Sequence, residues 1–326
     1  MHFIHLTLEN IGPFKSIHQI SFDYEPRKLI NVIVGTNGSG KTILCKSIAW
    51  VLGQNELNPI NWLHKGTAYA SVTLVFSISG KTYEVKRSLL ERRGEKWQIE
   101  TKLKVENEFD ENGKFMEDPD QFLQILLPPA LLAILFGSDG ETLSGEENYR
   151  KLTIPEFISW VSQRIDDAEI SGQERYIGYL ASNMRTILNG KHVNAGTDEI
   201  MLAVLQLQKF FRDWILSSDN LPIAWKHLHG ESLPWLIDSP VSRMNIADGI
   251  TAAELFSESK SQVVLVSFPD GIGQSAANIL WPKIGCIHTL QVGWNLFGGS
   301  EVIIFGRNIC LTRDDQTDLI QIVRCD

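Results

Sequence analysis

The segment Gly35–Thr42 constrains this chain more than any other feature. It reads Gly-Thr-Asn-Gly-Ser-Gly-Lys-Thr, a complete G-x-x-x-x-G-K-[ST] loop. Glycines let backbone N–H groups close around the β- and γ-phosphates, the Lys41 ammonium reaches the same oxygens, and the Thr42 hydroxyl binds Mg²⁺. The pattern predicts an ATP and Mg²⁺ site, whose nucleotide-binding residues are Gly35, Thr36, Asn37, Gly38, Ser39, Gly40, Lys41 and Thr42.

The flanking sequence gives this loop the setting that it needs. A nearly continuous apolar run over 29–34 predicts a strand covered on both faces, and 43–52 predicts a helix directly after the loop. A phosphate-binding loop also needs an acidic group for Mg²⁺. The best candidate is Asp238, at the end of the apolar strand 233–237, because ligands bind at the carboxyl ends of strands in open α/β sheets. The alternative is a carboxylate that caps a turn before Pro240.

The rest of the chain predicts an α/β protein. Alternation over 4–8, 17–22, 72–78, 83–85 and 97–105 predicts strands that pair as hairpins, and 263–266 and the last forty residues also predict strands. Helical patterns cover 119–136, interrupted by two prolines, then 145–190 and 197–216.

Composition excludes several classes of protein. The net charge is −9, so a nucleic acid would need a local basic patch. The four cysteines form no C-x-x-C pair, which disfavours a zinc site. The most apolar stretch, 122–136, is too short and too broken by proline to span a bilayer, and the N-terminus has no secretion signal. The prediction is a cytoplasmic protein without membrane contact.

Residues 81–104 form the one local excess of positive charge, with eight basic and four acidic side chains. A basic hairpin of this kind predicts contact with a DNA backbone, with Trp97 stacking on a base. The alternative is a solvated sheet face, with Trp97 packed inside. Arg87 and Lys15 are each candidates for approach to the nucleotide, and an ordinary surface lysine is an equal alternative for Lys15.

Four further segments carry a resemblance to a known family. The opening 8–16 followed by the Gly35–Thr42 loop resembles ATPases of the SMC/RecF/RecN type, which are ABC-type heads that act on DNA. Residues 136–141 resemble a stretch of the DndD ATPase of phosphorothioate-linked defence systems. Residues 194–199 resemble a degenerate ABC signature, and 238–245 resemble a Walker B strand with its D-loop.

The resemblance implies an α/β P-loop NTPase of the ABC/SMC-head type, two-lobed, with a mixed sheet and flanking helices. It implies an N-terminal lobe over 1–145, a short helical stub over 146–192 and a C-terminal lobe over 193–326. Asn194, Ala195 and Gly196 would close over ATP held by a second copy, which implies a homodimer with ATP between its heads. Asp139 would join Thr42 and Asp238 at the metal, and the catalytic set would be Lys41, Asp238 and Ser239.

The sequence departs from the family pattern at four places. Ser239 stands where most ABC heads carry the glutamate that activates water, so hydrolysis is expected to be slow. Asn194 replaces the signature serine, and Ser267-Phe268-Pro269-Asp270 replaces the switch histidine. About fifty residues separate Asp139 from Asn194, too few for the long coiled coil of SMC proteins.

The expected function is an SMC/DndD-like ATPase that dimerises around ATP and acts on DNA or drives a partner effector, in anti-phage defence or DNA repair. The partner would come from a multi-gene system. The alternative is a nucleotide-sensing module with negligible hydrolysis that gates a partner nuclease or adaptor. A small-molecule kinase would share the loop but would not explain the resemblances at 194–196 and 238–240.

Overall fold

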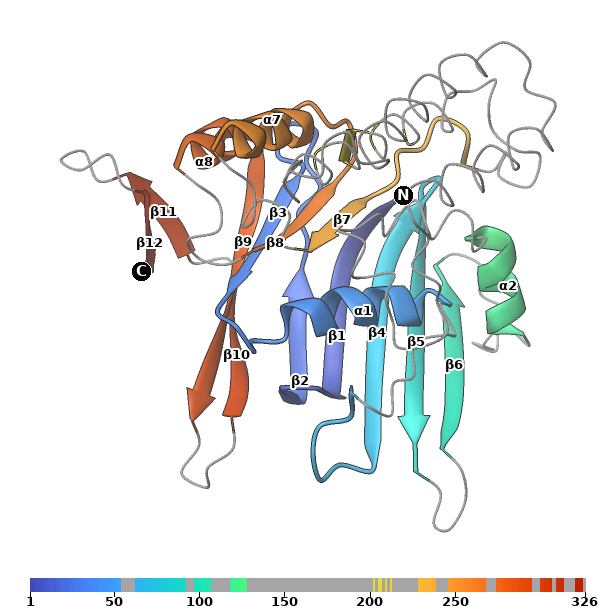
Figure 1. The fold of residues 1–326 in the computed structure, drawn as a ribbon. Coiled ribbons are helices and arrows are strands. Elements are labelled where there is room, and N and C mark those ends of the chain that lie inside the picture. The colour runs from blue at the N-terminus through green and yellow to red at the C-terminus, as the bar shows by residue number, and fades with distance from the viewer. Residues whose placement is uncertain are drawn as a thin grey trace, which may run out of the picture.

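The structure is a computed structural model of residues 1–326. The described residues are 1–53, 62–91, 97–106, 118–127, 228–238, 246–267, 274–294, 300–306, 309–313 and 320–324, with single helical positions at 202, 205, 206, 209 and 212. Within these residues the chain forms two five-stranded sheets and a separate two-stranded ribbon, with helices between and beside them (Figure 1).

The first sheet is antiparallel and is built from consecutive hairpins. Its order is β2-β1-β4-β5-β6, from β1 (His2–Ile11), β2 (Phe14–Ser21), β4 (Tyr69–Ile78), β5 (Lys81–Leu90) and β6 (Gln98–Val105). Alternate side chains of β1, β4 and β5 are fully buried on one face, as the period-two pattern of the sequence predicts. The hairpins predicted from 4–22 and 72–85 are confirmed, and β6 adds the strand predicted at 97–105.

The second sheet is mixed and joins distant parts of the chain. Its order is β10-β9-β3-β8-β7, from β3 (Ile30–Gly35), β7 (Trp235–Asp238), β8 (Val263–Ser267), β9 (Ile284–Trp294) and β10 (Ser300–Gly306). Strands β7, β8, β3 and β9 are parallel, and β10 is antiparallel to β9. Strands β11 (Ile309–Arg313) and β12 (Ile320–Arg324) form the ribbon.

Helices cover both faces of the mixed sheet. Helix α1 (Lys41–Val51) lies between the two sheets, in one core with residues from both, such as Leu8, Phe76, Ile33 and Val266. Helices α7 (Ile246–Ser257) and α8 (Gln274–Leu280) pack on the opposite face, against β3, β7 and β8 (Figure 1). Sequence analysis gave no element for α7 or α8. It did predict a strand at 29–34 with no solvent face, and β3 is buried throughout.

The remaining predicted helices are only partly described. Helix α2 (Pro119–Leu126) forms the first half of the helical stretch predicted at 119–136 and ends two residues before Pro128. The described positions of 197–216 are helical, and Leu205 and Arg212 among them are buried. The stretch 145–190 and the boundaries proposed near 145 and 192 lie outside the described residues. No described helix is long and apolar enough to cross a membrane.

Gln262 is one of the buried polar connections between the two sheets. Its side chain is fully buried beside the start of β8 and bonds to both backbone groups of Phe3 in β1: the Phe3 N–H donates to Oε1 at 2.7 Å, and Nε2 donates to Phe3 O at 3.0 Å. Nε2 also lies 3.1 Å from Asp23 O, beyond the end of β2. The Gln262 side-chain amide therefore links the antiparallel sheet to the mixed sheet.

Replacing Gln262 with leucine is expected to lower the free energy of unfolding by about 2–4 kcal/mol, because the Phe3 N–H and C=O would be buried without partners. Gln19→Leu on exposed β2 is the matched control, with an expected change within about 0.5 kcal/mol. Urea unfolding followed by tryptophan fluorescence measures both variants. Equal stability of the two would contradict the role given to Gln262.

Candidate nucleotide site

The loop between β3 and α1 takes a shape that only its own glycines permit. Gly38 and Gly40 have φ values of +78° and +89°, in the left-handed region that other residues avoid. A Cβ on Gly40 would lie 2.7 Å from atoms of Pro13 and of Phe14, and a Cβ on Gly35 would lie 2.2 Å from Ser39 Oγ. The loop is thus closely packed at the carboxyl end of β3, with no room for side chains at Gly35 and Gly40.

Lys41 begins α1 and folds back into this loop. Its Nζ donates to Gly35 O at 2.6 Å and to Thr36 O at 2.8 Å, and the side chain is only 6% exposed. Burial lowers the pKa of Lys41 below its ordinary value, and the nearby Asp238 carboxylate partly opposes that shift. An anion bound in the loop would stabilise the charged form of Lys41, as the Asp238 carboxylate does. The buried ammonium therefore favours binding of an anion at this site.

Thr42 and Asp238 meet across 196 residues of sequence. Thr42 Oγ1 donates to Asp238 Oδ2 at 2.8 Å, and Asp238 is buried at the carboxyl end of β7. Strand β8 lies between β7 and β3, so the contact depends on the parallel order of three strands. The structure therefore brings together the loop and the acidic residue that the sequence singled out.

These residues fit a nucleotide with Mg²⁺. The first N–H groups of α1 have no acceptor within the helix, and its positive end faces the loop. Ser39 Oγ is buried and has no hydrogen-bond partner among the described groups. A threonine hydroxyl beside a carboxylate is an all-oxygen donor pair of the kind that Mg²⁺ prefers.

Arg87 was predicted to lie on the basic hairpin surface or to approach the nucleotide, and the structure instead buries it. It is 1% exposed and donates to Trp50 O and Thr101 Oγ1, and its guanidinium forms an ion pair with Asp120. The alternation of β5 explains the difference, because Arg87 faces inward beside Val85 and Leu89 while Lys86 faces outward. Sequence reasoning missed Asp120, whose signal was an acidic residue in the first turn after the Asp118-Pro119 helix start.

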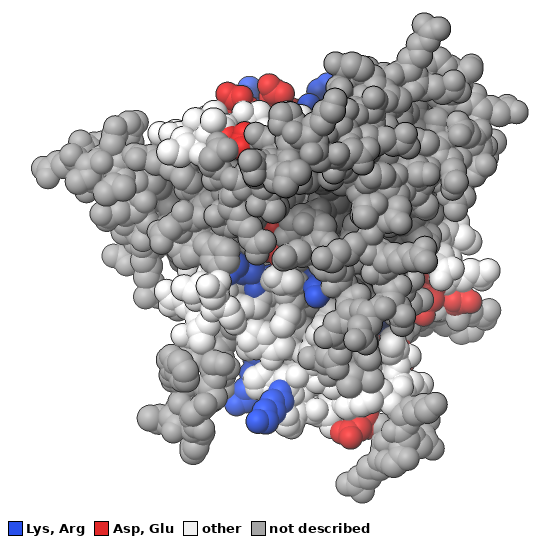
Figure 2. Space-filling view, in the orientation of Figure 1, with Lys and Arg blue, Asp and Glu red and all other residues white. Residues whose placement is uncertain are grey.

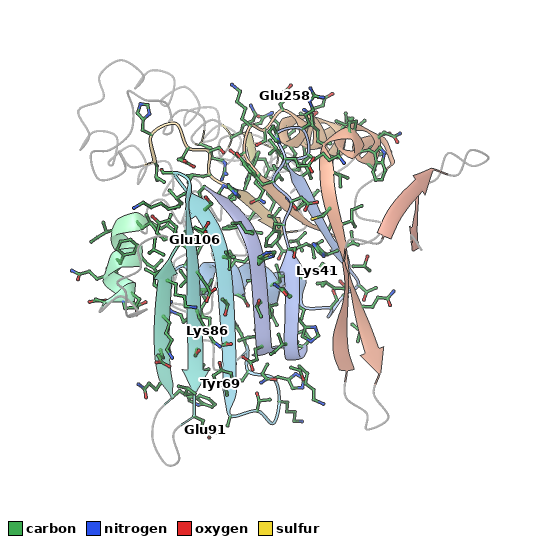
Figure 3. All side chains as sticks on the ribbon, turned by 180° about the vertical axis from the view of Figure 1, so that it is seen from behind. Lys41, Tyr69, Lys86, Glu91, Glu106 and Glu258 are labelled. Atoms are coloured by element: carbon green, nitrogen blue, oxygen red, sulfur yellow. The ribbon has the colours of Figure 1, made fainter. Side chains whose placement is uncertain are left out.

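The described part of the 81–104 hairpin is close to neutral on its outer face. Lys102 pairs with Glu100 at 3.2 Å and Lys104 with Glu84 at 3.8 Å. Figure 3 looks onto this face, with Lys86 near Tyr69, whose ring centroid is 5.8 Å from Lys86 Nζ. Trp97 is partly buried and packs against the core, as the alternative reading predicted. Arg92, Arg93 and Lys96 lie outside the described residues.

The opposite side of the molecule carries no broad basic surface among its described residues. Figure 2 shows this side, where lysines and arginines form small separate groups with uncharged residues between them. Lys15 is exposed on β2. The described surface therefore adds no second candidate for nucleic-acid contact.

Several predicted site residues lie outside the described part of the chain. They are Ser239, Asp139 and the signature-like Asn194, Ala195 and Gly196. The segment at the switch position is described only at Ser267, which ends β8 and is buried.

The arrangement defines a class of protein: a P-loop NTPase whose nucleotide loop connects β3 of the mixed sheet to α1, the helix that packs against both sheets. A match over residues 5–185 to the AAA domain family (AAA_23) covers more than half of the chain. The chain belongs to that family.

Comparisons with known proteins agree with this class. The "DNA double-strand break repair Rad50 ATPase" of Nanoarchaeum equitans is 39% identical over 85 residues, which is 26% of this chain and 10% of that protein. The chain thus matches only about a tenth of the length of that relative.

Solved structures give the fold. An SMC head domain from Thermotoga maritima superposes with a TM-score of 0.52 at 16% identity, over 93% of this chain and 98% of that one. An SMC head solved with the C-winged helix domain of ScpA superposes with a TM-score of 0.54 at 14% identity, over 94% and 98%. The fold is that of an SMC-type ABC ATPase head, as the sequence resemblance implied.

Replacing Gly40 with alanine tests the loop geometry. The substitution is expected to lower the free energy of unfolding by about 2–4 kcal/mol, because it adds a clash with Phe14 and Pro13 to an unfavourable φ. Gly38→Ala is the matched control: its φ is also positive, but its Cβ would meet nothing within 4 Å, so about 1 kcal/mol is expected. Chemical denaturation without nucleotide measures both, and equal losses would contradict the close packing at Gly40.

Proposed function

We propose that this chain binds ATP with Mg²⁺ at the Gly35–Thr42 loop and hydrolyses it as an SMC/DndD-like ATPase head. The observation that carries the proposal is the hydrogen bond between Thr42 and Asp238, at 2.8 Å. It joins the Gly35–Thr42 loop to a strand-end carboxylate, and a loop hydroxyl with such a carboxylate is the pair that holds Mg²⁺ in P-loop NTPases, which supports the proposal. Membership of the AAA domain family supports the same reading.

Each residue of the site has a role in this function. Lys41 would exchange its two carbonyl acceptors, Gly35 O and Thr36 O, for phosphate oxygens. The N–H groups of the loop and of the α1 start would hold the same phosphates. Thr42 and Asp238 would hold Mg²⁺, with Asp139 as a further acidic group supplied by the family resemblance. The bound ion would neutralise charge on the phosphates as the terminal bond breaks.

The catalytic set proposed is Lys41, Asp238 and Ser239. Ser239 follows the Walker B aspartate where most ABC heads carry glutamate, and serine is a much weaker base than a carboxylate. Positioning and charge neutralisation therefore supply most of the rate, and turnover is slow.

Dimerisation and partner contacts are part of the same proposal. Asn194, Ala195 and Gly196 of one copy would close over ATP held by another, giving a homodimer with nucleotide between the heads. The protein would work in the cytoplasm with a partner from a multi-gene defence or repair system. The ScpA complex of an SMC head and the repair role in the name of the Rad50 relative support a partner protein and a link to DNA.

DNA contact is proposed at residues 81–104. The support is the local excess of basic side chains, of which Arg92, Arg93 and Lys96 fall between β5 and β6 in the sequence. Arg87 is withdrawn from this set because it is buried and paired with Asp120. The contact would then involve Arg92, Arg93, Lys96 and Lys86 rather than the paired Lys102 and Lys104 of β6.

A second candidate is a nucleotide-sensing module that binds ATP, hydrolyses it negligibly and gates a partner nuclease or adaptor. Ser239 and the short segment between Asp139 and Asn194 favour it, because a weak base slows hydrolysis and a head without a long arm cannot tether distant DNA. Both candidates share the same ATP site and differ in turnover.

Phosphate release in the steady state distinguishes them. Wild type is measured with and without duplex DNA beside Lys41→Ala, which is expected to lower turnover by about a hundredfold or more, since the loop loses its cation. Lys46→Ala, on the same helix but outside the loop, is the matched control and is expected to keep full activity. DNA-stimulated turnover that depends on Lys41 supports the ATPase. Tight ATP binding without turnover supports the sensing module, and no ATP binding contradicts both.

Asp238→Asn isolates the metal role. The amide oxygen can still accept from Thr42, so the fold is expected to persist, but the Mg²⁺ concentration for half-maximal activity should rise about 10- to 100-fold because the negative ligand is lost. A magnesium titration of phosphate release measures the shift. An unchanged titration would remove Asp238 from the metal site.

A further inference from the structure

Arg87 connects four secondary-structure elements through one buried guanidinium. It lies on the inner face of β5, and its Nη1 donates to Trp50 O, in the last turn of α1, at 2.6 Å. Its Nε lies 3.2 Å from Thr101 Oγ1 on β6, and its Nη2 is paired with Asp120 on α2. The guanidinium carbon is 5.7 Å from the centroid of the Trp50 ring.

The contact with Trp50 O fixes the far end of the nucleotide helix. Helix α1 begins with Lys41 in the loop and ends at Val51, so Trp50 O is one of the last carbonyls of the helix, and it accepts from both Gly53 N at 3.1 Å and Arg87. A cation at this end complements the helix dipole. Eleven residues make a rigid rod about 16 Å long, so a shift at one end of α1 moves the other.

The contact with Asp120 extends this connection to the surface. The Asp120 side chain is about half exposed (47%) at the start of α2, whereas Arg87 is 1% exposed. Thr101 Oγ1 also donates to Asp120, at 3.1 Å from Oδ1, so β5 through Arg87 and β6 through Thr101 hold the same carboxylate of α2. The fork of the guanidinium can bond to Trp50 O and Asp120 at once, which a lysine ammonium cannot do with the same geometry.

We propose that Arg87 is a positioning residue that couples α2 to the nucleotide loop through α1. Binding of ATP at Lys41 and Thr42 shifts the position of α1. The ion pair of Arg87 with Asp120 then passes this shift to α2. The inference rests on the proposed function, because the coupling begins from ATP in the Gly35–Thr42 loop. The inference goes beyond the proposed function because it names the residues through which the ATP site would signal to the segment that follows α2.

Hydrogen exchange of α2 amides, with and without a non-hydrolysable ATP analogue and Mg²⁺, tests the coupling in the full chain. Wild type is compared with Asp120→Asn and Arg87→Lys. Asp118→Asn is the matched control: it removes the same charge from the same helix end, where Asp118 accepts from Gln121 N at 2.9 Å, and an asparagine caps equally well. Calorimetric titration measures nucleotide affinity for each variant.

In wild type the nucleotide is expected to slow exchange in α2 by about fivefold or more, a coupling of ordinary size. Asp120→Asn and Arg87→Lys are expected to lose most of this slowing while their affinity for the nucleotide stays within about threefold of wild type. Asp118→Asn keeps the full effect. Because Asp120 is half exposed, Asp120→Asn should fold even if Arg87→Lys does not.

A merely structural ion pair gives a different result. In that case Asp120→Asn would raise exchange in α2 equally with and without nucleotide, and the ratio between the two would stay at the wild-type value. That outcome overturns the coupling. So does an exchange rate of the wild-type α2 amides that is the same with and without bound nucleotide. A wild type that binds no nucleotide in the calorimeter overturns the proposed function itself, and the coupling with it.

Discussion

Strand β3 is buried on both faces, and the layers of the molecule follow from that constraint. A parallel strand needs neighbours on both edges and cover above and below, because its backbone and apolar side chains have no solvent side. Strands β8 and β9 pair with its edges, α1 and the antiparallel sheet cover one face, and α7 and α8 cover the other. The loop at the carboxyl end of β3 is therefore surrounded by elements from both the N-terminal and the C-terminal parts of the chain.

Buried polar groups fix how these layers meet. Gln262 bonds to β1 from the start of β8, and Asn31 in β3 accepts from Asp23 N at 2.7 Å and from Cys286 Sγ at 2.8 Å. An amide buried without its partners costs more than a lost apolar contact, so such groups permit one arrangement of the sheets and penalise others. Arg87 has the same effect at the other end of α1, where it also connects with the surface through Asp120.

Much of the site could be predicted from the sequence because its signals are local. The glycines and Lys41–Thr42 stand in one loop between a strand and a helix that their own patterns predict. Asp238 was predictable as a carboxylate at the end of an apolar strand. The alternation of β5 also predicts that the Arg87 side chain faces inward, but the number of basic residues over 81–104 obscured that signal. Its partner Asp120 was not predictable, because their contact depends on the packing of α2 on β6. Helices α7 and α8 were missed because short segments rich in alanine and glycine have weak periodicity.

The sequence by itself determined the chemistry of the loop, the hairpins of the first sheet and the resemblance to SMC-type heads, since these depend on residues close together in the chain. The tertiary structure decided which distant residues meet. Thr42 and Asp238 are 196 positions apart, and only the parallel order of β3, β8 and β7 brings their oxygens to 2.8 Å. It likewise decided that the partners of the inward-facing Arg87 are Trp50 and Asp120. The physical reason is that strand order and the face of a helix that is covered are set by long-range packing, which no local pattern of residues encodes.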